Sequence, residues 1–172
     1  MGVVCLPCLL SGTAMDAPAS VVETLGDMGQ VIVPASAIVA AIGHKDKHGA
    51  LQLGTAYLTA MGVVLILKPA INHPRPDGGR QSFPSGHAAS AFVGAAFLQR
   101  RYGWSYGGPA YAAATFVAYS RVHARRHLPS DVIAGGVIGV AANLIFTKRH
   151  EKAIVYPVFE PDGVGLAVEV RW

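Results

Sequence analysis

The chain alternates between long apolar segments and short charged loops. The apolar segments cover about residues 29–43, 49–67, 86–99, 107–120 and 132–147. Their length and their content of Ala and Leu favour helices over strands. The C-terminal sequence "AVEVRW" instead alternates apolar and polar positions after the turn signal "PDG", which predicts a short hairpin. We therefore predict an all-α antiparallel bundle of about five to six helices with a β-hairpin-like tail.

This pattern divides the chain into three parts. Residues 1–28 resemble a secretory signal or a first membrane anchor, because an apolar run is followed by small residues around Ala14. The positive stretch that usually starts a signal is missing from this segment. Residues 29–150 contain the five apolar segments and would form the helical domain, and residues 151–172 would form the tail.

Composition favours a membrane location. Hydrophobic residues make up 52% of the chain and charged residues only 14%, whereas a typical soluble domain has about 25% charged residues. Only residues 49–67 approach the length of about 20 apolar residues that a spanning helix needs. A soluble periplasmic bundle is therefore the alternative to a membrane-embedded one.

The charged loops indicate an orientation. "HKDKH", "QRR" and "KRHEK" follow the first, third and fifth apolar segments. In an antiparallel bundle these three loops share one end, and the loops after the second and fourth segments share the other. Basic loops prefer the cytoplasm, so we predict a bacterial-type inner-membrane protein whose second end faces the periplasm.

The net charge of +4 fits an anionic membrane surface or a phosphorylated substrate. It does not indicate a nucleic-acid partner, because the few basic residues follow no recognition-helix or stacking-strand pattern. Nothing in the pattern specifies an oligomeric state.

The two loops at the second end carry the candidate binding groups. They are "KPAINHPRPDGGRQSFPSGH" (residues 68–87) and "SRVHARRHLPSD" (residues 120–131). Lys68, Arg75 and Arg121 offer donors to phosphate oxygens, the arginines as planar forks and the lysine as a point charge. Ser85 can cap the helix that follows, and Gly86 lets the backbone N–H groups at the helix start approach an anion.

Two histidines and an aspartate complete the candidate site. His87 would lie in the first helical turn, where it can give a proton to a leaving oxygen. Pro129 suits the start of the last helix, so His127 would lie just before that helix and Asp131 in its first turn. There Asp131 can accept a hydrogen bond from one nitrogen of His127 and leave the other nitrogen free to attack. Such an arrangement is typical of phosphoryl transfer.

These residues resemble the three-part signature of the type 2 phosphatidic acid phosphatase superfamily, which includes lipid phosphate phosphatases, bacterial acid phosphatases and vanadium haloperoxidases. The three parts are Lys68 with Arg75-Pro76, then Pro84-Ser85-Gly86-His87, and Ser120-Arg121 with His127 and Asp131. The resemblance covers residues 68–131. It implies that the second to fifth apolar segments form the family's helical core, within a helical phosphatase domain that we predict over residues 29–150.

The resemblance also implies roles for the residues. His127 would form a phosphohistidine, Asp131 would orient it, and His87 would protonate the leaving group and then activate water. The phosphate-binding residues would be Lys68, Arg75, Ser85, Gly86 and Arg121. The resemblance implies no metal and no other cofactor, and vanadate is expected to act as a phosphate mimic or inhibitor.

We therefore expect a phosphoric monoester hydrolase acting on a phosphomonoester or pyrophosphate, in particular that of a lipid. The alternatives are a vanadate-dependent haloperoxidase, for which the chain is short, a soluble periplasmic acid phosphatase acting on small esters, and an inert binder of phosphorylated lipids. An apolar cleft beside His127 would indicate a lipid, whereas an open polar mouth would indicate small esters. The other polar loop residues are assigned no catalytic role. We expect His73 to be an ordinary loop residue and Asp77 a turn residue. Arg80, Arg125 and Arg126 are expected to be solvated loop charges, with contacts to a larger anionic head group as the alternative, and His123 is given no role.

Overall fold

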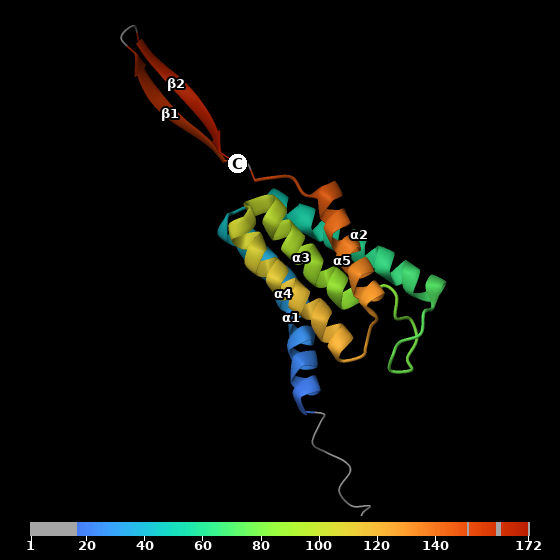
Figure 1. The fold of residues 1–172 in the computed structure, drawn as a ribbon. Coiled ribbons are helices and arrows are strands. Elements are labelled where there is room, and N and C mark those ends of the chain that lie inside the picture. The colour runs from blue at the N-terminus through green and yellow to red at the C-terminus, as the bar shows by residue number, and fades with distance from the viewer. Residues whose placement is uncertain (1–16, 151, 161–162, 172) are drawn as a thin grey trace, which may run out of the picture.

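The computed structural model describes residues 17–150, 152–160 and 163–171. In this part of the chain, five helices are followed by a two-stranded antiparallel hairpin (Figure 1). The elements are α1 (Ala17–Gly43), α2 (Lys47–Ile71), α3 (Gly86–Tyr102), α4 (Trp104–His123), α5 (Pro129–Phe146), β1 (Lys152–Glu160) and β2 (Gly163–Arg171). The predicted fold class, a helical bundle with a hairpin tail, is confirmed.

The first helix begins earlier than its apolar segment. Residues 1–16 of the signal-like segment lie outside the described residues, whereas residues 17–28 form the first turns of α1, which continues to Gly43. The expected boundary after residue 28 therefore falls inside a helix. These first turns reach the candidate site.

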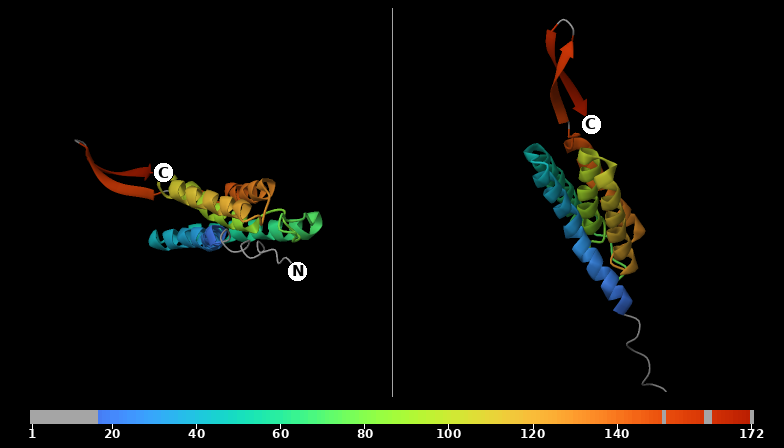
Figure 2. Two further views of the ribbon diagram at one scale, coloured as in Figure 1. Left: turned by 60° about the horizontal axis from the view of Figure 1, so that its bottom comes forward. Right: turned by 90° about the vertical axis from the view of Figure 1, so that its left-hand side faces the viewer.

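Helix α3 occupies the centre of the bundle and contacts all four other helices (Figure 2). Its buried positions are rich in small residues, among them Ala88, Ala89, Ala91, Ala95 and Ala96. On α5, a side chain at Gly135 would overlap the carbonyl oxygen of Ser85, and one at Gly139 would overlap that of Ala89. Small residues on both helices thus let α5 lie directly against the first half of α3, as is common in membrane bundles.

The outer surface of the bundle is apolar. Large apolar side chains are exposed on α1, α2 and α5, including Val31, Ile32, Val39, Ile42, Leu51, Leu58, Leu65, Ile66, Ile133, Val137, Leu144 and Ile145. Within the described residues, three helices are long and apolar enough to cross a membrane, over Val21–Gly43, Lys47–Ile71 and Pro129–Phe146. The expectation that only residues 49–67 approach this length was wrong. Helix α1 begins well before residue 29 and passes through Asp27, and α5 adds the turn from Pro129 to the apolar segment that begins at Val132.

The three basic loops share one end of the bundle, as predicted. Asp46, just before α2, accepts hydrogen bonds from Arg101 Nε (2.6 Å) and Nη2 (2.8 Å) near the end of α3. Arg101 Nη1 also donates to the carbonyl oxygens of Lys148 and Arg149, which follow α5. Both members of the ion pair are buried. One guanidinium therefore joins three connecting segments.

Replacing this arginine should destabilise the bundle. Arg101→Met should lower the free energy of unfolding by about 3 kcal/mol or more, because the Asp46 carboxylate would stay buried without its partner. Unfolding of the detergent-solubilised protein by heat or denaturant measures the loss. Arg100→Met is the matched control, since Arg100 Nε donates to the carbonyl oxygen of Thr147 (2.6 Å) rather than to a carboxylate. Equal losses in the two variants would contradict the importance of the ion pair.

Candidate active site

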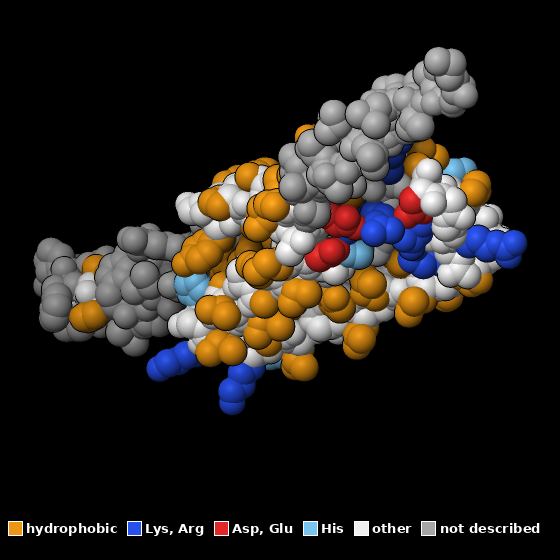
Figure 3. Space-filling model, turned by 90° about the horizontal axis from the view of Figure 1, so that it is seen from below, with side chains coloured by type: hydrophobic (Ala, Val, Ile, Leu, Met, Phe, Trp, Pro, Cys, Tyr) orange, Lys and Arg blue, Asp and Glu red, His pale blue; other side chains and the backbone are white. Residues whose placement is uncertain are grey.

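The two candidate loops meet at the opposite end of the bundle, around a cavity of about 330 Å³. Figure 3 looks onto this end and shows Lys, Arg, Asp, Glu and His side chains gathered within a largely hydrophobic surface. The cavity is lined by Glu23, Asp27, Lys68, Arg75, Gly86, His87, Arg121, Arg126 and His127. Most of the predicted site residues are among them, whereas Ser85 and Asp131 lie behind the wall.

Lys68 and Arg75 are held by carbonyl groups of the loop between α2 and α3. Lys68 lies in the last turn of α2, and its Nζ donates to the carbonyl oxygen of Gln81 at 2.9 Å. Arg75 Nε donates to the carbonyl oxygen of Arg80 at 3.2 Å. Neither cation forms an ion pair with a carboxylate among the described residues, so both positive charges can act on an anion in the cavity.

His127 lies in the loop before α5, and only 4% of it is exposed. Its Nδ1 is 3.3 Å from Ser82 Oγ, and Ser82 Oγ donates to Asp131 Oδ2 at 2.5 Å. Nδ1 and Asp131 Oδ2 are 3.7 Å apart, too far for the direct hydrogen bond expected from the sequence. Ser82 therefore links the imidazole to the carboxylate. Sequence analysis missed this serine, because its position directly before "FPSGH" was the one sequence signal that pointed to it.

Asp131 is completely buried in the first turn of α5. Its Oδ2 also accepts the backbone N–H of Leu128 at 2.8 Å, which fixes the carboxylate against the residues that precede the helix. Its Oδ1 faces His73 Nδ1 at 4.0 Å. His73, expected to be an ordinary loop residue, thus lies beside the carboxylate that orients His127.

The surroundings keep the His127 ring neutral. Burial, followed by the positive charges of Arg75 and Lys68, lowers the pKa of His127 to about 4. Because Nδ1 faces Ser82, Nε2 is the nitrogen left for the cavity. A neutral ring with a free nitrogen is the form that attacks an electrophile.

The first turn of α3 brings His87 to the same cavity. Ser85 caps this helix as predicted, since its Oγ accepts a backbone N–H of the first turn at 3.4 Å. The N–H of Ser85 donates to the carbonyl oxygen of Asp131 at 2.9 Å, which joins the starts of α3 and α5. Gly86 and His87 form the cavity wall in front of this contact. The two candidate histidines, His87 and His127, therefore share one cavity.

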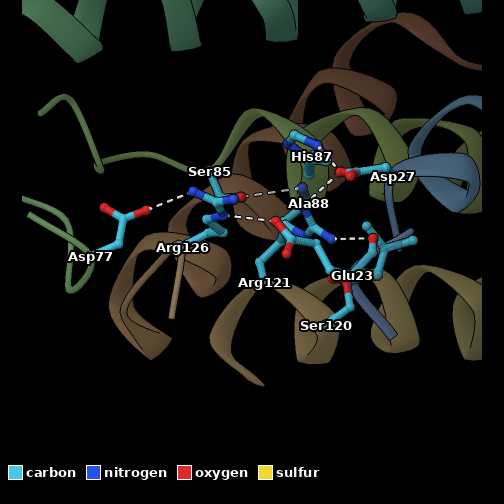
Figure 4. A network of polar contacts seen from close by, with 10 residues as sticks. Glu23, Asp27, Asp77, Ser85, His87, Ala88, Ser120, Arg121 and Arg126 are labelled. Carbon is cyan, nitrogen blue, oxygen red and sulfur yellow. Dashed lines mark hydrogen bonds and ion pairs between the residues drawn. The ribbon is translucent and has the colours of Figure 1, made fainter. Parts of the chain in front are cut away.

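Two acidic residues of α1 complete the cavity wall (Figure 4). Asp27 Oδ1 lies 2.6 Å from Arg121 Nη1 and 2.9 Å from His87 Nε2. Glu23 Oε1 accepts a hydrogen bond from Arg126 Nε at 2.7 Å. Sequence analysis missed both acids, because they lie in the segment assigned to a signal or anchor, and no local pattern connects them with the distant loops.

The surroundings of His87 act on its pKa in opposite directions. Burial and the positive charge of Arg121 lower the pKa of His87, while the hydrogen bond with Asp27 raises it, and the pKa stays below its ordinary value. The protonated ring is therefore the minor form near neutral pH. Its acid form becomes available on the acidic side.

Arg126 has a structural role at the rim of the cavity. It was expected to be a solvated loop charge, but besides Glu23 it pairs with Asp77, whose Oδ2 lies 3.0 Å from Nη1. This one side chain thus ties α1 and the loop between α2 and α3 to the loop between α4 and α5. Arg80 and Arg125 are exposed, in agreement with their expected place on the surface.

The arrangement suits the transfer of a phosphoryl group. Lys68, Arg75 and Arg121 line a cavity that has room for a tetrahedral oxyanion and can offer it positively charged donors. One buried, neutral imidazole is oriented through a serine and a carboxylate, and a second imidazole lines the same cavity. The two rings can divide attack and proton transfer between them.

Comparison with known proteins gives the family of the chain. The family model described as the PAP2 superfamily matches residues 77–154. The chain is 30% identical over 161 residues to the lipid A 4'-phosphatase of Helicobacter pylori. This alignment covers 86% of this chain and 81% of the relative. The chain is also 38% identical over 105 residues to the lipid A 1-phosphatase of Porphyromonas gingivalis. That alignment covers 57% of this chain and 23% of the relative.

Two solved structures share the fold. The crystal structure of Aquifex aeolicus LpxE matches with a TM-score of 0.64 at 24% identity, over 77% of this chain and 87% of that one. The first transmembrane PAP2 type phosphatidylglycerolphosphate phosphatase from Bacillus subtilis matches with a TM-score of 0.60 at 24% identity, over 77% and 76% of the two chains.

The family follows from the extent of these matches together with the site. The similarity to the Helicobacter pylori protein extends over most of both chains. The predicted signature residues lie in or directly behind the wall of one cavity at the end of an apolar bundle. The chain is therefore a membrane phosphatase that belongs to the PAP2 superfamily.

Proposed function

We propose that this phosphatase removes a phosphate group from a membrane lipid through a phosphohistidine on His127, without a metal ion. The observation that carries the proposal is that His127, His87 and the phosphate-binding cations line one cavity. Two relatives are named as lipid A 4'-phosphatase and lipid A 1-phosphatase. The phosphates of lipid A are therefore the first substrates to test.

In the first step, Nε2 of His127 attacks phosphorus, and the bond from phosphorus to the ester oxygen breaks. Protonated His87 gives its proton to that oxygen, so the lipid leaves as an alcohol. Lys68, Arg75 and Arg121 balance the charge on the remaining phosphate oxygens. The ring of His127 becomes cationic as it is phosphorylated, and Asp131 stabilises this charge through Ser82.

In the second step, water replaces His127 on phosphorus. His87, now neutral, takes a proton from the water molecule as its oxygen attacks. The bond from phosphorus to Nε2 breaks, and inorganic phosphate leaves. Both histidines return to their starting protonation states, so the cycle needs no other reactant than water.

An apolar groove beside the site supports a lipid substrate. It has a volume of about 520 Å³ and is lined by Phe92, Thr115, Ala118, Val132, Ile133, Gly136, Val137, Val140, Ala141 and Leu144. The groove runs between α4 and α5 from Val132, which directly follows Asp131 in the chain. Ile133 and Val137 are more than half exposed on this face. An acyl chain can lie in the groove while its phosphate enters the polar cavity.

The placement of charge supports an orientation. The loops after α1, α3 and α5 are basic and lie at the end of the bundle away from the cavity, and basic loops favour the cytoplasm. The cavity end also carries arginines, of which Arg121 and Arg126 are paired with acidic residues of α1. We therefore place the site on the periplasmic side of a bacterial-type inner membrane. An accessibility assay with an impermeant thiol reagent distinguishes the two orientations, with single cysteines introduced at Gly79 or at Lys148 after Cys5 and Cys8 have been replaced by serine.

Loss of His127 tests the function directly. Detergent-purified His127→Ala should release phosphate from an aryl phosphate and from lipid phosphates at the background rate only, and wild-type activity should survive a metal chelator. His123→Ala is the matched control, because the ring of His123 stacks on Tyr119 at 5.4 Å and lies outside the cavity wall. Acid-labile radioactive phosphate should be trapped on the wild type and not on His127→Ala. A wild type no faster than His127→Ala on every substrate would refute the proposal.

The pH profile follows from the two histidines. His127 must be neutral to attack, so kcat/KM should fall as the pH drops through its pKa of about 4. His87 must be protonated to donate, and its pKa lies below the ordinary 6.5, so kcat/KM should also fall as the pH rises through that lowered value. We expect a bell-shaped profile with its maximum between these limits. A maximum on the alkaline side of neutrality would contradict the assignment of the two roles.

Ser82 should matter for kcat. Ser82→Ala removes the link between His127 and Asp131, and a hydrogen bond to a charged group contributes about 1.5–3 kcal/mol. We therefore expect kcat to fall about tenfold or more, with little change in KM. Ser130→Ala is the matched control, because Ser130 is exposed in the first turn of α5. Equal kcat values for the two variants would show that Ser82 does not act as the link.

A further inference from the structure

Asp27 contacts the same donors that the proposed mechanism assigns to the substrate. Its Oδ1 accepts a hydrogen bond from Arg121 Nη1 at 2.6 Å and lies 2.9 Å from His87 Nε2. Figure 4 shows the carboxylate reaching from α1 toward these two groups. In the mechanism, Arg121 holds a phosphate oxygen and His87 protonates the leaving oxygen. One carboxylate oxygen therefore bridges the two side chains that a phosphate would bridge.

The position of Asp27 is fixed by the close packing of α1 on α4. The residue before it, Gly26, is buried, and a side chain there would overlap Ser120 and the guanidinium of Arg121. Arg121 Nη2 also donates to the backbone carbonyl oxygen of Glu23, one turn earlier on α1, at 2.5 Å. The backbone of α1 is thus held against Arg121 independently of the Asp27 side chain. A carboxylate at position 27 is aimed at the cavity by this packing.

We propose that Asp27 is an internal competitor for the substrate phosphate and sets how tightly the site binds anions. This inference rests on the proposed function of Arg121 and His87. When a phosphate binds, its oxygens replace the carboxylate on these two donors. The side chain of Asp27 is 47% exposed, so the displaced carboxylate can turn toward water, and the exchange costs far less than breaking a fully buried ion pair.

The exchange would serve both ends of the catalytic cycle. Before substrate binds, the carboxylate relieves the repulsion between the cations of the cavity. After hydrolysis, it competes with inorganic phosphate for the same donors and so favours release of the product. It also acts on the proton of His87: burial and the charges of Arg121 on α4 and Arg75 in the loop before α3 lower the pKa of His87, and Asp27 opposes them.

Asp27→Asn tests the proposal, because it keeps the shape of the side chain and removes its charge. The inhibition constant of inorganic phosphate should fall about fivefold, the effect expected of a half-exposed ion pair. The alkaline limb of the kcat/KM profile should also move to lower pH, since His87 loses the anion that helps to hold its proton. Asp27→Ser is a second neutral variant, to be used if asparagine is not tolerated at this position.

Glu23→Gln is the matched control. It removes one negative charge from the same helix and the same cavity, but Glu23 pairs with Arg126 at the rim and leaves Asp27 on Arg121 and His87. Its effect on the inhibition constant should be smaller than that of Asp27→Asn, and the alkaline limb should stay in place. Unchanged phosphate inhibition in both neutral Asp27 variants of an active enzyme would overturn the proposal.

The two proposals can fail separately. A wild type that hydrolyses no phosphate ester would refute the proposed function and not the competition. Thermal unfolding titrated with inorganic phosphate measures the affinity of the cavity without turnover. Stronger stabilisation of Asp27→Asn than of the wild type by phosphate would still support the competition, and equal stabilisation would overturn it.

Discussion

The backbone N–H of Ser85 donates to the carbonyl oxygen of Asp131 at 2.9 Å, and through this hydrogen bond the start of α3 rests on the start of α5. The contact needs a residue without a side chain at Gly135, because any Cβ there would overlap the carbonyl oxygen of Ser85. His87 lies in the turn after Ser85, and His127 lies just before the helix that carries Asp131. One close backbone contact thus holds together the two helix starts that carry the imidazoles to one cavity.

Two carboxylates act on these imidazoles from very different surroundings. Asp131 is fully buried and is held by Ser82 and by the N–H of Leu128, so it has no way to turn toward water. Asp27 is about half exposed and is held by side chains that can also bind an anion. Burial therefore makes one carboxylate a fixed part of the site, and exposure makes the other exchangeable.

The bundle separates its apolar and polar contacts along its length. Small residues of α3 form the centre, and large apolar side chains point outward from α1, α2 and α5. The polar groups concentrate at the two ends, with the Asp46–Arg101 ion pair at one and the phosphate cavity at the other. This division puts a polar cavity at the end of an apolar bundle, which suits a lipid whose phosphate lies at the membrane surface while its acyl chains stay in the bilayer.

The sequence by itself determined the helices and predicted which residues gather at one end of the bundle. Apolar segments and turn residues depend on local preferences, so they predicted the five helices, the Ser85 cap and the start of α5 at Pro129. The antiparallel order then sorted the loops to the correct ends. Residue types and spacing within two loops were sufficient to select His87, His127 and their cationic neighbours, most of which line the cavity.

Only the tertiary structure decided that Ser82 lies between His127 and Asp131 and that Asp27 contacts Arg121. Ser82 lies 45 residues before His127, and Asp27 lies 94 residues before Arg121. Their contacts depend on how closely helices approach, which is set by residues such as Gly26 and Gly135 through packing across the bundle. A spacing pattern along the chain carries no information about such distances, so the serine link and the acidic side of the cavity became visible only in three dimensions.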